Sequence, residues 1–432
     1  MNDHTLSRRN FVKSAGVIGA ATFSVLPALQ GQQAPSRKLR VGVMGLKRGQ
    51  AHIRGFQAVT NVEIAYVCDV DKNRTAEGAA LAGKGQKKLP KAVGDFRHIL
   101  EDPDVDILSI AAPNFWHAPA TILGCQAGKH VYVEKPGSYS AEEGELMVKA
   151  ARKYNRKVQQ GTQRRSYASM IAGIQKLHDG GIGKIHYART WYANTRTSIG
   201  HGKPAAVPDY LDYDLWQGPV PKRPYKDNLV HYNWHWHWHY GGGELANNGV
   251  HALDIARWGL RVDYPTRVTY LGSRYHFDDD QETPDIGTAQ FDFGEVGASW
   301  DASSCHGRKD ENLAFCTFYG EGGSMAFDTA GYKVYDLKGR MIDEREGTSG
   351  DSFSTASVPH FQNFCDAIRE DTPLNQDIGE GQKSTLWCHL GNIAYRTQSV
   401  LDINPITGRI KNNPEAQKLW KRTYRKGWKP KV

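Results

Sequence analysis

The chain has 432 residues, of which 39% are hydrophobic, 23% charged and 10% aromatic. This composition excludes a disordered, collagen-like or coiled-coil chain, and the length is sufficient for two or three domains with their own cores. No apolar run reaches the ~18 residues that a membrane helix needs, so we expect no integral membrane span.

The formal net charge of +9 comes from the two ends of the chain. Residues 1–31 contribute +2 and residues 418–432 contribute +7, so the part between them is neutral. A neutral body offers no broad basic face to phosphates, and we therefore expect no nucleic-acid partner. The basic tail, residues 411–432, interleaves Trp420, Tyr424 and Trp428 with its cations, which is typical of a tail anchored on the surface by aromatic side chains.

None of the six cysteines forms a Cys-x-x-Cys pair, which excludes a zinc ribbon and a thioredoxin motif. Cys68 and Cys125 lie in apolar runs and are interpreted as small core residues. The cysteine spacing neither requires nor excludes disulfides.

Residues 1–36 are interpreted as an export signal and linker. An Arg8-Arg9 pair followed by Phe11 and Lys13 precedes a short apolar stretch, and this pattern resembles a twin-arginine signal. The alternatives are an ordinary secretory signal and a flexible tail. Export by the twin-arginine route predicts a folded, periplasmic protein. Because little free nicotinamide cofactor is available there, such an enzyme should hold its cofactor tightly.

Residues 37–161 predict a doubly wound α/β domain. The first segment, LRVGVMG, is a near-continuous apolar run, as a strand buried on both faces requires. Strands and helices then alternate, which predicts a parallel sheet with helices on both faces and ligands at the carboxyl ends of the strands. Strands are expected at 39–45, 62–69, 105–112, 130–136 and 157–161, and helices at 50–59, 117–128 and 141–154.

The turn after the first strand predicts a shortened phosphate-binding loop. It contains Gly45, Leu46, Lys47 and Arg48 but lacks the middle glycine of G-x-G-x-x-G. Its backbone N–H groups can still meet a pyrophosphate at a helix N-terminus, with Lys47 or Arg48 in direct contact. Asp69 follows Gly45 by 24 residues, which suits a ligand of the adenosine ribose and favours NAD over NADP.

Other polar residues lie at the expected strand ends and complete a predicted cofactor site. Arg74 follows the second strand, and its positive charge would reduce the preference for NAD over NADP. The remaining predicted cofactor residues are Pro113, Asn114, His117, Glu134, Lys135 and Gln163.

Residues 162–410 predict a substrate-binding and oligomerisation domain of α+β type. A helix at 166–177 precedes a strand at 184–193, and Gly-containing turns separate the apolar segments that follow. This pattern predicts a large, mostly antiparallel sheet with helices. Open-faced sheets of this kind often pair, so we expect a homodimer or homotetramer. Later strands are expected at 266–277, 287–293, 297–304, 313–320 and 323–328, and later helices at 249–258, 359–370 and 380–398.

The segment HYNWHWHWHY at 231–240 alternates histidine with aromatic residues. On a strand His235, His237 and His239 would share a face, and metal ligation is one interpretation. The alternatives are a pocket wall and partly buried structural histidines. Because no carboxylate or cysteine ligand accompanies them, we expect no metal and predict a substrate-binding wall that includes Trp234.

Taken together, these motifs resemble the Gfo/Idh/MocA family (glucose–fructose oxidoreductase and inositol dehydrogenase). The resemblance extends from residue 38 to about residue 410 and is most specific at Glu134-Lys135-Pro136. It implies an N-terminal Rossmann domain, an NAD cofactor and a sugar or cyclitol substrate. The supporting motifs are Cys68-Asp69-Val70-Asp71, Ala112-Pro113-Asn114 with His117, and the segment from Gly241 to Trp258.

The resemblance also assigns the predicted catalytic residues. Lys135 matches the lysine that touches both cofactor and substrate, and His251 matches the pocket histidine. Four residues before that histidine the family usually has an aspartate, where this chain has Asn247. Because an amide cannot accept a proton, Lys135 and His251 are expected to share the acid–base chemistry.

Three functions are consistent with the sequence. The first is an exported oxidoreductase acting on a sugar or cyclitol hydroxyl, with Arg164 or Arg165 binding an acidic or hydroxyl group of the substrate. The second is an NAD-dependent, redox-neutral glycoside hydrolase, in which transient oxidation allows elimination of the aglycone, followed by hydration and re-reduction. The third is a non-catalytic sugar-binding relative.

Overall fold

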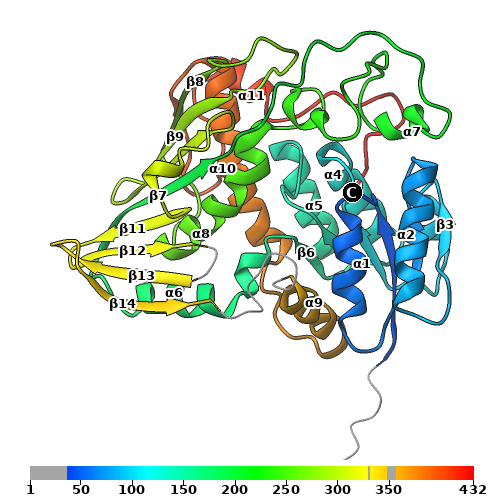
Figure 1. Cartoon of the computed structure of the whole chain (residues 1–432), viewed down its shortest axis with the longest axis horizontal. Coiled ribbons are helices and arrows are strands. Elements are labelled where there is room, and N and C mark those ends of the chain that lie inside the picture. The colour runs from blue at the N-terminus through cyan, green and yellow to red at the C-terminus, as the bar shows by residue number, and fades with distance from the viewer. Residues whose placement is uncertain (1–36, 329–330, 348–356) are drawn as a thin grey trace, which may run out of the picture. The chain divides into compact units, whose positions relative to one another are not determined.

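The computed structural model describes residues 37–328, 331–347 and 357–432. The predicted export signal, residues 1–36, lies outside the described residues, so it stays a prediction. Two sheets dominate the described chain, one parallel and one mostly antiparallel (Figure 1).

The first sheet has six strands in the order β3-β2-β1-β4-β5-β6, and every neighbouring pair is parallel. This arrangement confirms the predicted doubly wound Rossmann fold. The strand order reverses between β1 and β4, which is where such sheets bind ligands. The strands are β1 Leu39–Met44, β2 Val62–Cys68, β3 Lys91–Val93, β4 Ile107–Ile110, β5 His130–Val133 and β6 Val158–Gln160.

Apolar residues cover both faces of this sheet, as the unbroken apolar strands require. One face packs through Val41 and Val43 and the other through Leu108 and Ile110, all four fully buried. The helices of this domain are α1 Gly49–Gln57, α2 Lys72–Lys84, α3 Arg97–Glu101, α4 Asn114–Gln126 and α5 Ala141–Lys153.

A helix from the C-terminal part of the chain completes the first core. In helix α9, Val358–Glu370, Phe361 stacks on Tyr132 of β5 with ring centroids 4.6 Å apart. The same ring lies 4.6 Å from that of Phe56 in α1. The Rossmann core is therefore built from two segments that are far apart in the sequence.

The second sheet has nine strands in the order β14-β13-β12-β11-β7-β10-β9-β8-β15. Its neighbouring pairs are antiparallel except for β7 and β10, which confirms the mostly antiparallel prediction. The strands are β7 Ile185–Ala193, β8 Arg267–Ser273, β9 Ile286–Asp292, β10 Gly297–Ser303, β11 Cys316–Gly320, β12 Gly323–Phe327, β13 Gly331–Asp336, β14 Met341–Glu346 and β15 Leu401–Asp402.

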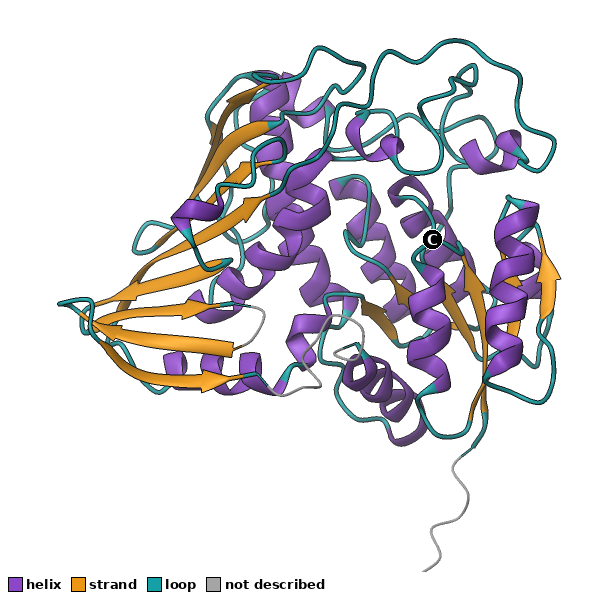
Figure 2. Cartoon of the chain, viewed as in Figure 1, coloured by secondary structure: helices purple, strands orange, loops and turns teal. Residues whose placement is uncertain are grey.

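Helices lie on one face of the second sheet and connect it to the first domain (Figure 2). Helix α10 contacts both α5 and β8, so it lies between the two sheets. The fully buried Trp387 of α10 stacks on Phe291 of β9. The main helices here are α6 Ala168–His178, α8 Val250–Leu260 and α10 Ile378–Thr397, with short helices α7 Tyr213–Gln217 and α11 Pro414–Lys418.

The C-terminal segment after α11 packs along the Rossmann domain. Trp428 contacts Trp116 of α4 with ring centroids 5.4 Å apart, and Arg422 Nε lies 2.7 Å from the buried Glu143 Oε1. Trp420 is also buried. The tail is thus anchored by aromatic side chains and by a buried ion pair.

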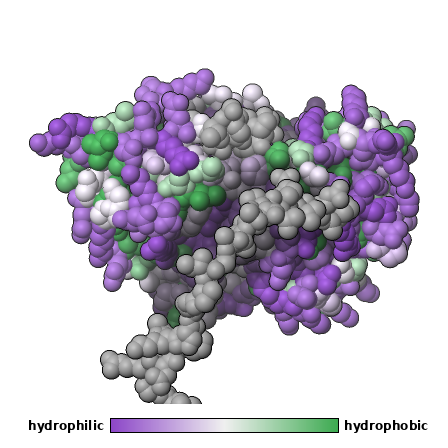
Figure 3. All heavy atoms as spheres, turned by 90° about the horizontal axis from the view of Figure 1, so that it is seen from below, coloured by the Kyte–Doolittle hydropathy of each residue, from purple (hydrophilic) through white to green (hydrophobic). Residues whose placement is uncertain are grey.

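The outer surface seen from below is mainly hydrophilic, with hydrophobic residues scattered among polar ones (Figure 3). Within the described ranges, no helix is both long and apolar enough to cross a bilayer. The six cysteines, all in the described part of the chain, form no disulfide.

Candidate active site

The loop after β1 meets the end of β2 at the carboxyl edge of the parallel sheet. Gly45 has φ +86°, and a Cβ there would lie 2.6 Å from the backbone of Ala111, so only glycine fits. The Asp69 carboxylate accepts hydrogen bonds from the backbone N–H of Leu46 at 2.7 Å and of Asp71 at 3.0 Å. Burial raises the pKa of Asp69, although these two N–H groups oppose the rise.

A cavity of about 590 Å³, here called the catalytic cavity, runs along these strand ends. One predicted cofactor residue, Gln163, does not line the cavity. Its side chain is buried behind Glu134 and donates a hydrogen bond to Glu134 Oε1 at 3.3 Å. The predicted cofactor residues that line the cavity are Gly45, Leu46, Lys47, Arg48, Asp69, Arg74, Pro113, Asn114, His117, Glu134 and Lys135.

Glu134 directly follows β5 and is held by cationic and polar groups from other parts of the chain. Its Oε1 accepts from Arg48 Nε at 2.8 Å and lies 3.1 Å from Nε2 of the fully buried His52. Burial alone would raise the pKa of this carboxyl, but Arg48 and His52 hold it well below its usual range. Glu134 is therefore an ionised anchor for the loop after β1.

Lys135 projects from the same strand end into the catalytic cavity. Its Nζ donates to the backbone oxygen of Asn247 at 2.8 Å and to Asn247 Oδ1 at 3.1 Å. Burial lowers the pKa of the lysine, with Glu134 opposing and Arg48 adding to the shift. Asn247 lies in a π-helical turn, Leu245–Gly249, a distortion that often occurs at functional sites.

His251 lies in the first turn of α8, four residues after Asn247, and both line the catalytic cavity as the helical spacing predicted. The buried Nδ1 of His251 has no hydrogen-bond partner in the structure. Burial and the neighbouring Lys135 hold the pKa of this imidazole well below its ordinary value. His251 is therefore neutral at neutral pH and has a ring nitrogen available for a ligand.

The histidine run does not form the strand on which its three histidines would have shared a face. Residues Asn233–Trp236 form a 3-10 turn, so His235, His237 and His239 do not share a face. His235 lines the catalytic cavity and stacks on Trp234, with ring centroids 3.6 Å apart. His237 Nδ1 lies 3.9 Å from a Glu282 oxygen, and His239 lines a different cavity.

The two tryptophans of the turn are both buried but have different surroundings. Trp234 packs in the Rossmann core against Phe115, whereas the Arg196 guanidinium lies over Trp236, 4.8 Å from the centre of its ring. No group of three or more His, Cys, Asp or Glu side chains in residues 37–328, 331–347 and 357–432 is placed to bind a metal ion.

The two candidate substrate arginines have different environments. Arg164 lines the catalytic cavity, with its guanidinium 3.8 Å from the centre of the Phe315 ring. Arg165 turns away from that cavity and forms a buried pair with Asp254, Nε to Oδ2 at 2.8 Å. Of the two arginines, only Arg164 is therefore placed to contact a substrate in the catalytic cavity, because the guanidinium of Arg165 is already paired with the Asp254 carboxylate.

A segment of the second domain crosses the catalytic cavity at the end of β2. The Lys72 N–H donates to the Tyr210 carbonyl at 2.9 Å, and the Asp212 N–H donates to the Val70 carbonyl at 2.9 Å. His231 Nε2 lies 2.8 Å from Asp71 Oδ2. We call residues 208–231 the clasp, because it joins the second domain to the end of β2.

Sequence reasoning missed several cavity residues. Tyr232, Asn248 and the clasp residue His231 line the catalytic cavity. The only sequence signal for His231 and Tyr232 is their position at the start of the histidine and aromatic run, and Asn248 has no such signal. Arg196, paired with Glu244, carried no motif at all, although both influence the charge around Lys135.

Known protein families match both halves of the chain. The model described as "Oxidoreductase family, NAD-binding Rossmann fold" matches residues 39–162, and "Oxidoreductase family, C-terminal alpha/beta domain" matches residues 184–281. The two matches thus describe one family of oxidoreductases whose N-terminal domain is an NAD-binding Rossmann fold. The chain belongs to the Gfo/Idh/MocA family.

Curated relatives match over a limited stretch. A "Glycosyl hydrolase family 109 protein" of Shewanella putrefaciens is 32% identical over 163 residues, which cover 32% of this chain and 36% of that protein. Its counterpart in Shewanella pealeana is 30% identical over 160 residues, or 32% of this chain and 35% of that protein. The chain thus spans about a third of the length of these relatives.

Solved structures share the fold over most of the chain. Levoglucosan dehydrogenase in complex with NADH has a TM-score of 0.68 at 20% identity, covering 85% of this chain and 100% of that chain. The WlbA dehydrogenase from Bordetella pertussis, in complex with NADH and UDP-GlcNAcA, has a TM-score of 0.64 at 20% identity, and the match covers 85% of this chain and 99% of that chain. At this identity the likeness shows the fold.

Proposed function

We propose that this protein transfers a hydride between NAD and a hydroxyl-bearing carbon of a sugar or cyclitol. The observation that carries the proposal is one cavity in which Lys135, Asn247 and His251 share a wall with the loops of the NAD-binding fold. Its volume of about 590 Å³ lies within the usual range for small-molecule sites. The NADH-bound sugar dehydrogenases of the same fold support a carbohydrate substrate.

The residues present fit the dinucleotide. Gly45 keeps a side chain out of the place where the loop meets the sheet, and Lys47 and Arg48 bring positive charge to it. Asp69 lies at the end of β2, where a ribose hydroxyl is expected. When bound, NAD supplies the hydride acceptor for oxidation and the hydride donor for reduction.

The chain itself supplies the proton transfer. A lowered pKa increases the fraction of Lys135 that is a neutral amine, and the neutral amine accepts the hydroxyl proton during oxidation. The two acceptors of Asn247 orient Nζ without competing for the proton. The unpartnered Nδ1 of His251 provides a second hydrogen-bonding position for the same substrate hydroxyl or its neighbour.

The test begins with protein purified without added cofactor. Denaturation should release NAD in near-stoichiometric amount, and adding sugars or cyclitols to the native protein should change the absorbance of the reduced cofactor. A protein that is empty and does not bind added NAD would overturn the proposal. Such a result would leave the non-catalytic sugar-binding function.

The clasp supports a tightly held cofactor. Residues 208–231 bond to the end of β2 through two backbone hydrogen bonds and the His231–Asp71 pair, so release of the adenosine end requires these contacts to open. We propose that the protein is exported by the twin-arginine route to the periplasm with its NAD already bound. Changing Arg8 and Arg9 to lysine should stop export, and continued export would overturn this part.

We propose a homo-oligomer through the second sheet. In the described chain, α6, α8 and α10 pack on one face of this sheet, and the opposite face carries only the short 3-10 helix Lys309–Glu311 (Figure 2). Exposed Leu271 and Tyr319 lie on strands β8 and β11 of this sheet. Light scattering should give at least twice the 48.2 kDa of one chain, and a monomer would contradict the proposal.

The family 109 glycosyl hydrolase relatives favour a second candidate, redox-neutral hydrolysis of a glycoside. The same Lys135 and His251 would then move protons while the bond to the aglycone breaks, and the cofactor would end in its starting state. Release of a chromogenic aglycone without added NAD or acceptor would favour this function. Sugar oxidation without aglycone release would favour net oxidation.

A further inference from the structure

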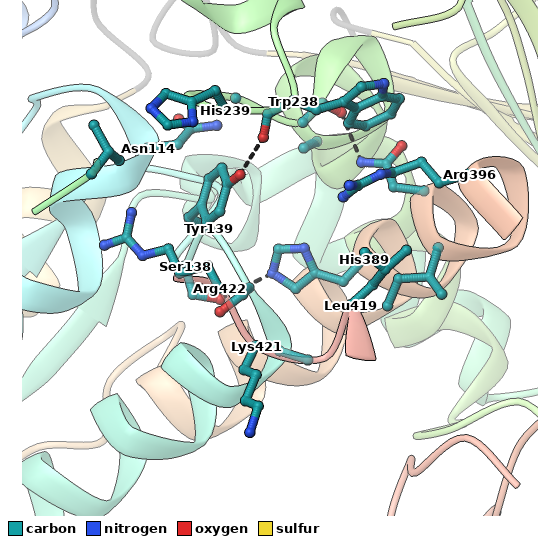
Figure 4. A pocket seen from close by; sticks show the side chains of 18 of the residues that line it. Asn114, Ser138, Tyr139, Trp238, His239, His389, Arg396, Leu419, Lys421 and Arg422 are labelled. Carbon is teal, nitrogen blue, oxygen red and sulfur yellow. Dashed lines mark hydrogen bonds between the residues drawn. The ribbon is translucent and has the colours of Figure 1, made fainter. Parts of the chain in front are cut away.

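A second cavity of about 390 Å³ lies beside the segment that follows Lys135 in the chain (Figure 4). Pro136, Ser138 and Tyr139 of this segment line it, whereas Lys135 lines the catalytic cavity. The other walls come from the loop around Trp238, from helix α10 and from residues 418–423 of the C-terminal segment. We call it the tail cavity.

Five cationic side chains line the tail cavity, of which Lys418 pairs with Glu415 and Arg422 with Glu143. Glu282 is the carboxylate in its lining, and it already accepts the Trp238 N–H at 2.6 Å. In the described part of the chain, no carboxylate oxygen lies within 4 Å of the cationic nitrogens of Arg223, Arg396 or Lys421. The cationic residues of the lining are Arg223, Arg396, Lys418, Lys421 and Arg422.

Arg422 provides an independent sign of a missing ligand. Its side chain is 6% exposed, yet the buried Nη1 has no hydrogen-bond partner, while Nη2 donates to the Phe115 carbonyl at 2.9 Å. An unpaired N–H on a buried guanidinium is costly, and the oxygen of an anionic ligand would satisfy it. The guanidinium lies 5.0 Å from the centre of the Tyr139 ring, so it is held in place at the cavity wall.

The remaining lining suits a hydroxylated ring. His389 Nε2 lies 3.1 Å from Ser138 Oγ, and both side chains come from different elements to the same place (Figure 4). Arg396 lies 5.1 Å from the centre of the Trp238 ring, which brings a cation and an aromatic face together. Aromatic faces beside polar hydrogen-bonding groups are typical of small-molecule sites that fix the orientation of their ligand.

We propose that the tail cavity binds a small acidic carbohydrate, a sugar ring that bears a carboxylate or a phosphate. The acidic group pairs with the guanidinium groups of Arg422 and Arg396, and the ring lies against Tyr139 and Trp238. Bidentate contacts between arginine and such anions are among the stronger hydrogen bonds in proteins. This site is distinct from the site of the proposed hydride transfer, because Lys135, Asn247 and His251 line the catalytic cavity and not the tail cavity, although Asn114 lines both.

The test is calorimetric titration of the full chain, as purified, with glucuronate, a hexose phosphate and glucose. At least one acidic sugar should bind, and the two acidic probes distinguish the carboxylate from the phosphate. Absence of binding by both acidic sugars up to several millimolar, or equal binding of neutral glucose, would overturn the proposal.

Variants locate the site. Arg422→Gln and Arg396→Gln should each weaken binding by about tenfold, a change that the loss of one charged contact can produce. Lys426→Gln, an exposed tail variant outside the lining, is the matched control and should change nothing. Arg396 is exposed and makes no buried ion pair, so its variant stays informative if the Arg422 variant fails to fold.

Lys135→Ala separates this proposal from the proposed function. Binding of the acidic sugar should be unchanged in this variant, because Lys135 lines the catalytic cavity. Loss of binding in Lys135→Ala together with normal binding in Arg396→Gln would place the ligand in the catalytic cavity and overturn the proposal.

Discussion

The two walls of the catalytic cavity are built in different ways. The Rossmann wall consists of strand ends and the turns that follow them, so backbone hydrogen bonds of the sheet fix residues such as Gly45, Asp69 and Lys135. The opposite wall consists of the clasp, a 3-10 turn and a π-helical turn, so local turns and side-chain packing, and not a sheet, fix residues such as His235 and Asn247. The first wall suits a constant cofactor, and the second suits a substrate that differs between relatives.

The largest expected effect tests the point where the two walls meet. Lys135→Ala should lower the rate of hydride transfer by about 10²–10⁴-fold, the usual contribution of a general acid or base. Bound NAD should remain, because Gly45, Asp69 and Arg48 are untouched. The measurement is turnover with the identified sugar, together with the NAD released on denaturation.

The control for this variant is Lys91→Ala, which removes an exposed lysine of the same sheet. It should leave turnover unchanged. Equal losses in both variants would mean that the Lys135 effect comes from damage to the sheet, and normal turnover in Lys135→Ala would remove the lysine from the mechanism.

The next largest effect separates the adjacent arginines. Arg165→Met leaves Asp254 buried without its cation, and loss of one partner from a buried pair costs about 3–5 kcal/mol of unfolding free energy. Arg164→Met should change stability little but raise the KM for sugar, since Arg164 faces the catalytic cavity. Urea unfolding and steady-state kinetics on both proteins check this pair, and reversed behaviour would contradict it.

Glycine variants test the Rossmann wall directly. Gly45→Ala should destabilise the protein by more than about 2 kcal/mol and abolish NAD retention, because the new Cβ meets the Ala111 backbone in addition to the cost of a positive φ. Gly128 also has a positive φ, +77°, but nothing lies within 4 Å of an added Cβ. Gly128→Ala should therefore cost only about 1–2 kcal/mol and keep NAD. Equal effects would contradict the role of the close approach.

The same two walls explain how much could be predicted from the sequence. The apolar runs and the alternation of strands and helices along the chain predicted the parallel sheet. They also predicted that the strand-end residues from Gly45 to Lys135 lie together, because the carboxyl ends of parallel strands meet at a common edge. Helical spacing brought Asn247 and His251 together for a similar reason. The polar edge strand β14, MIDERE, had no apolar alternation to reveal it.

The histidine run shows why the second wall was harder to predict. Its alternation was consistent with a strand that has three histidines on one face, with a pocket wall and with partly buried histidines. The pattern could not decide among these, because Trp234 and Trp236 are both buried in a 3-10 turn that only tertiary packing determines. The pairing of Arg165 with Asp254 depends on which way two adjacent side chains turn, and the sequence carries no signal for that. The clasp joins residues about 140 positions apart, such as Lys72 and Tyr210.

The pH dependence of oxidation follows from the lowered pKa of Lys135. Only the neutral amine accepts the hydroxyl proton, so the rate should rise by up to about tenfold per pH unit until the pH passes that pKa, and then level. Lys135→Arg should lose this rise, because a guanidinium stays protonated throughout. A rate profile that is unchanged in Lys135→Arg would assign the titrating group to another residue.

The smallest expected effect tests whether the second wall also retains the cofactor. His231→Ala removes the contact with Asp71 and leaves the backbone bonds of the clasp in place. Loss of one partly buried hydrogen bond of about 1 kcal/mol predicts release of NAD that is roughly fivefold faster. His201→Ala is the matched control, since it removes an exposed histidine next to Asp280 outside the cavity lining. If release is unchanged in His231→Ala, cofactor retention rests on the Rossmann wall alone, and the difference between the walls is then one of substrate binding.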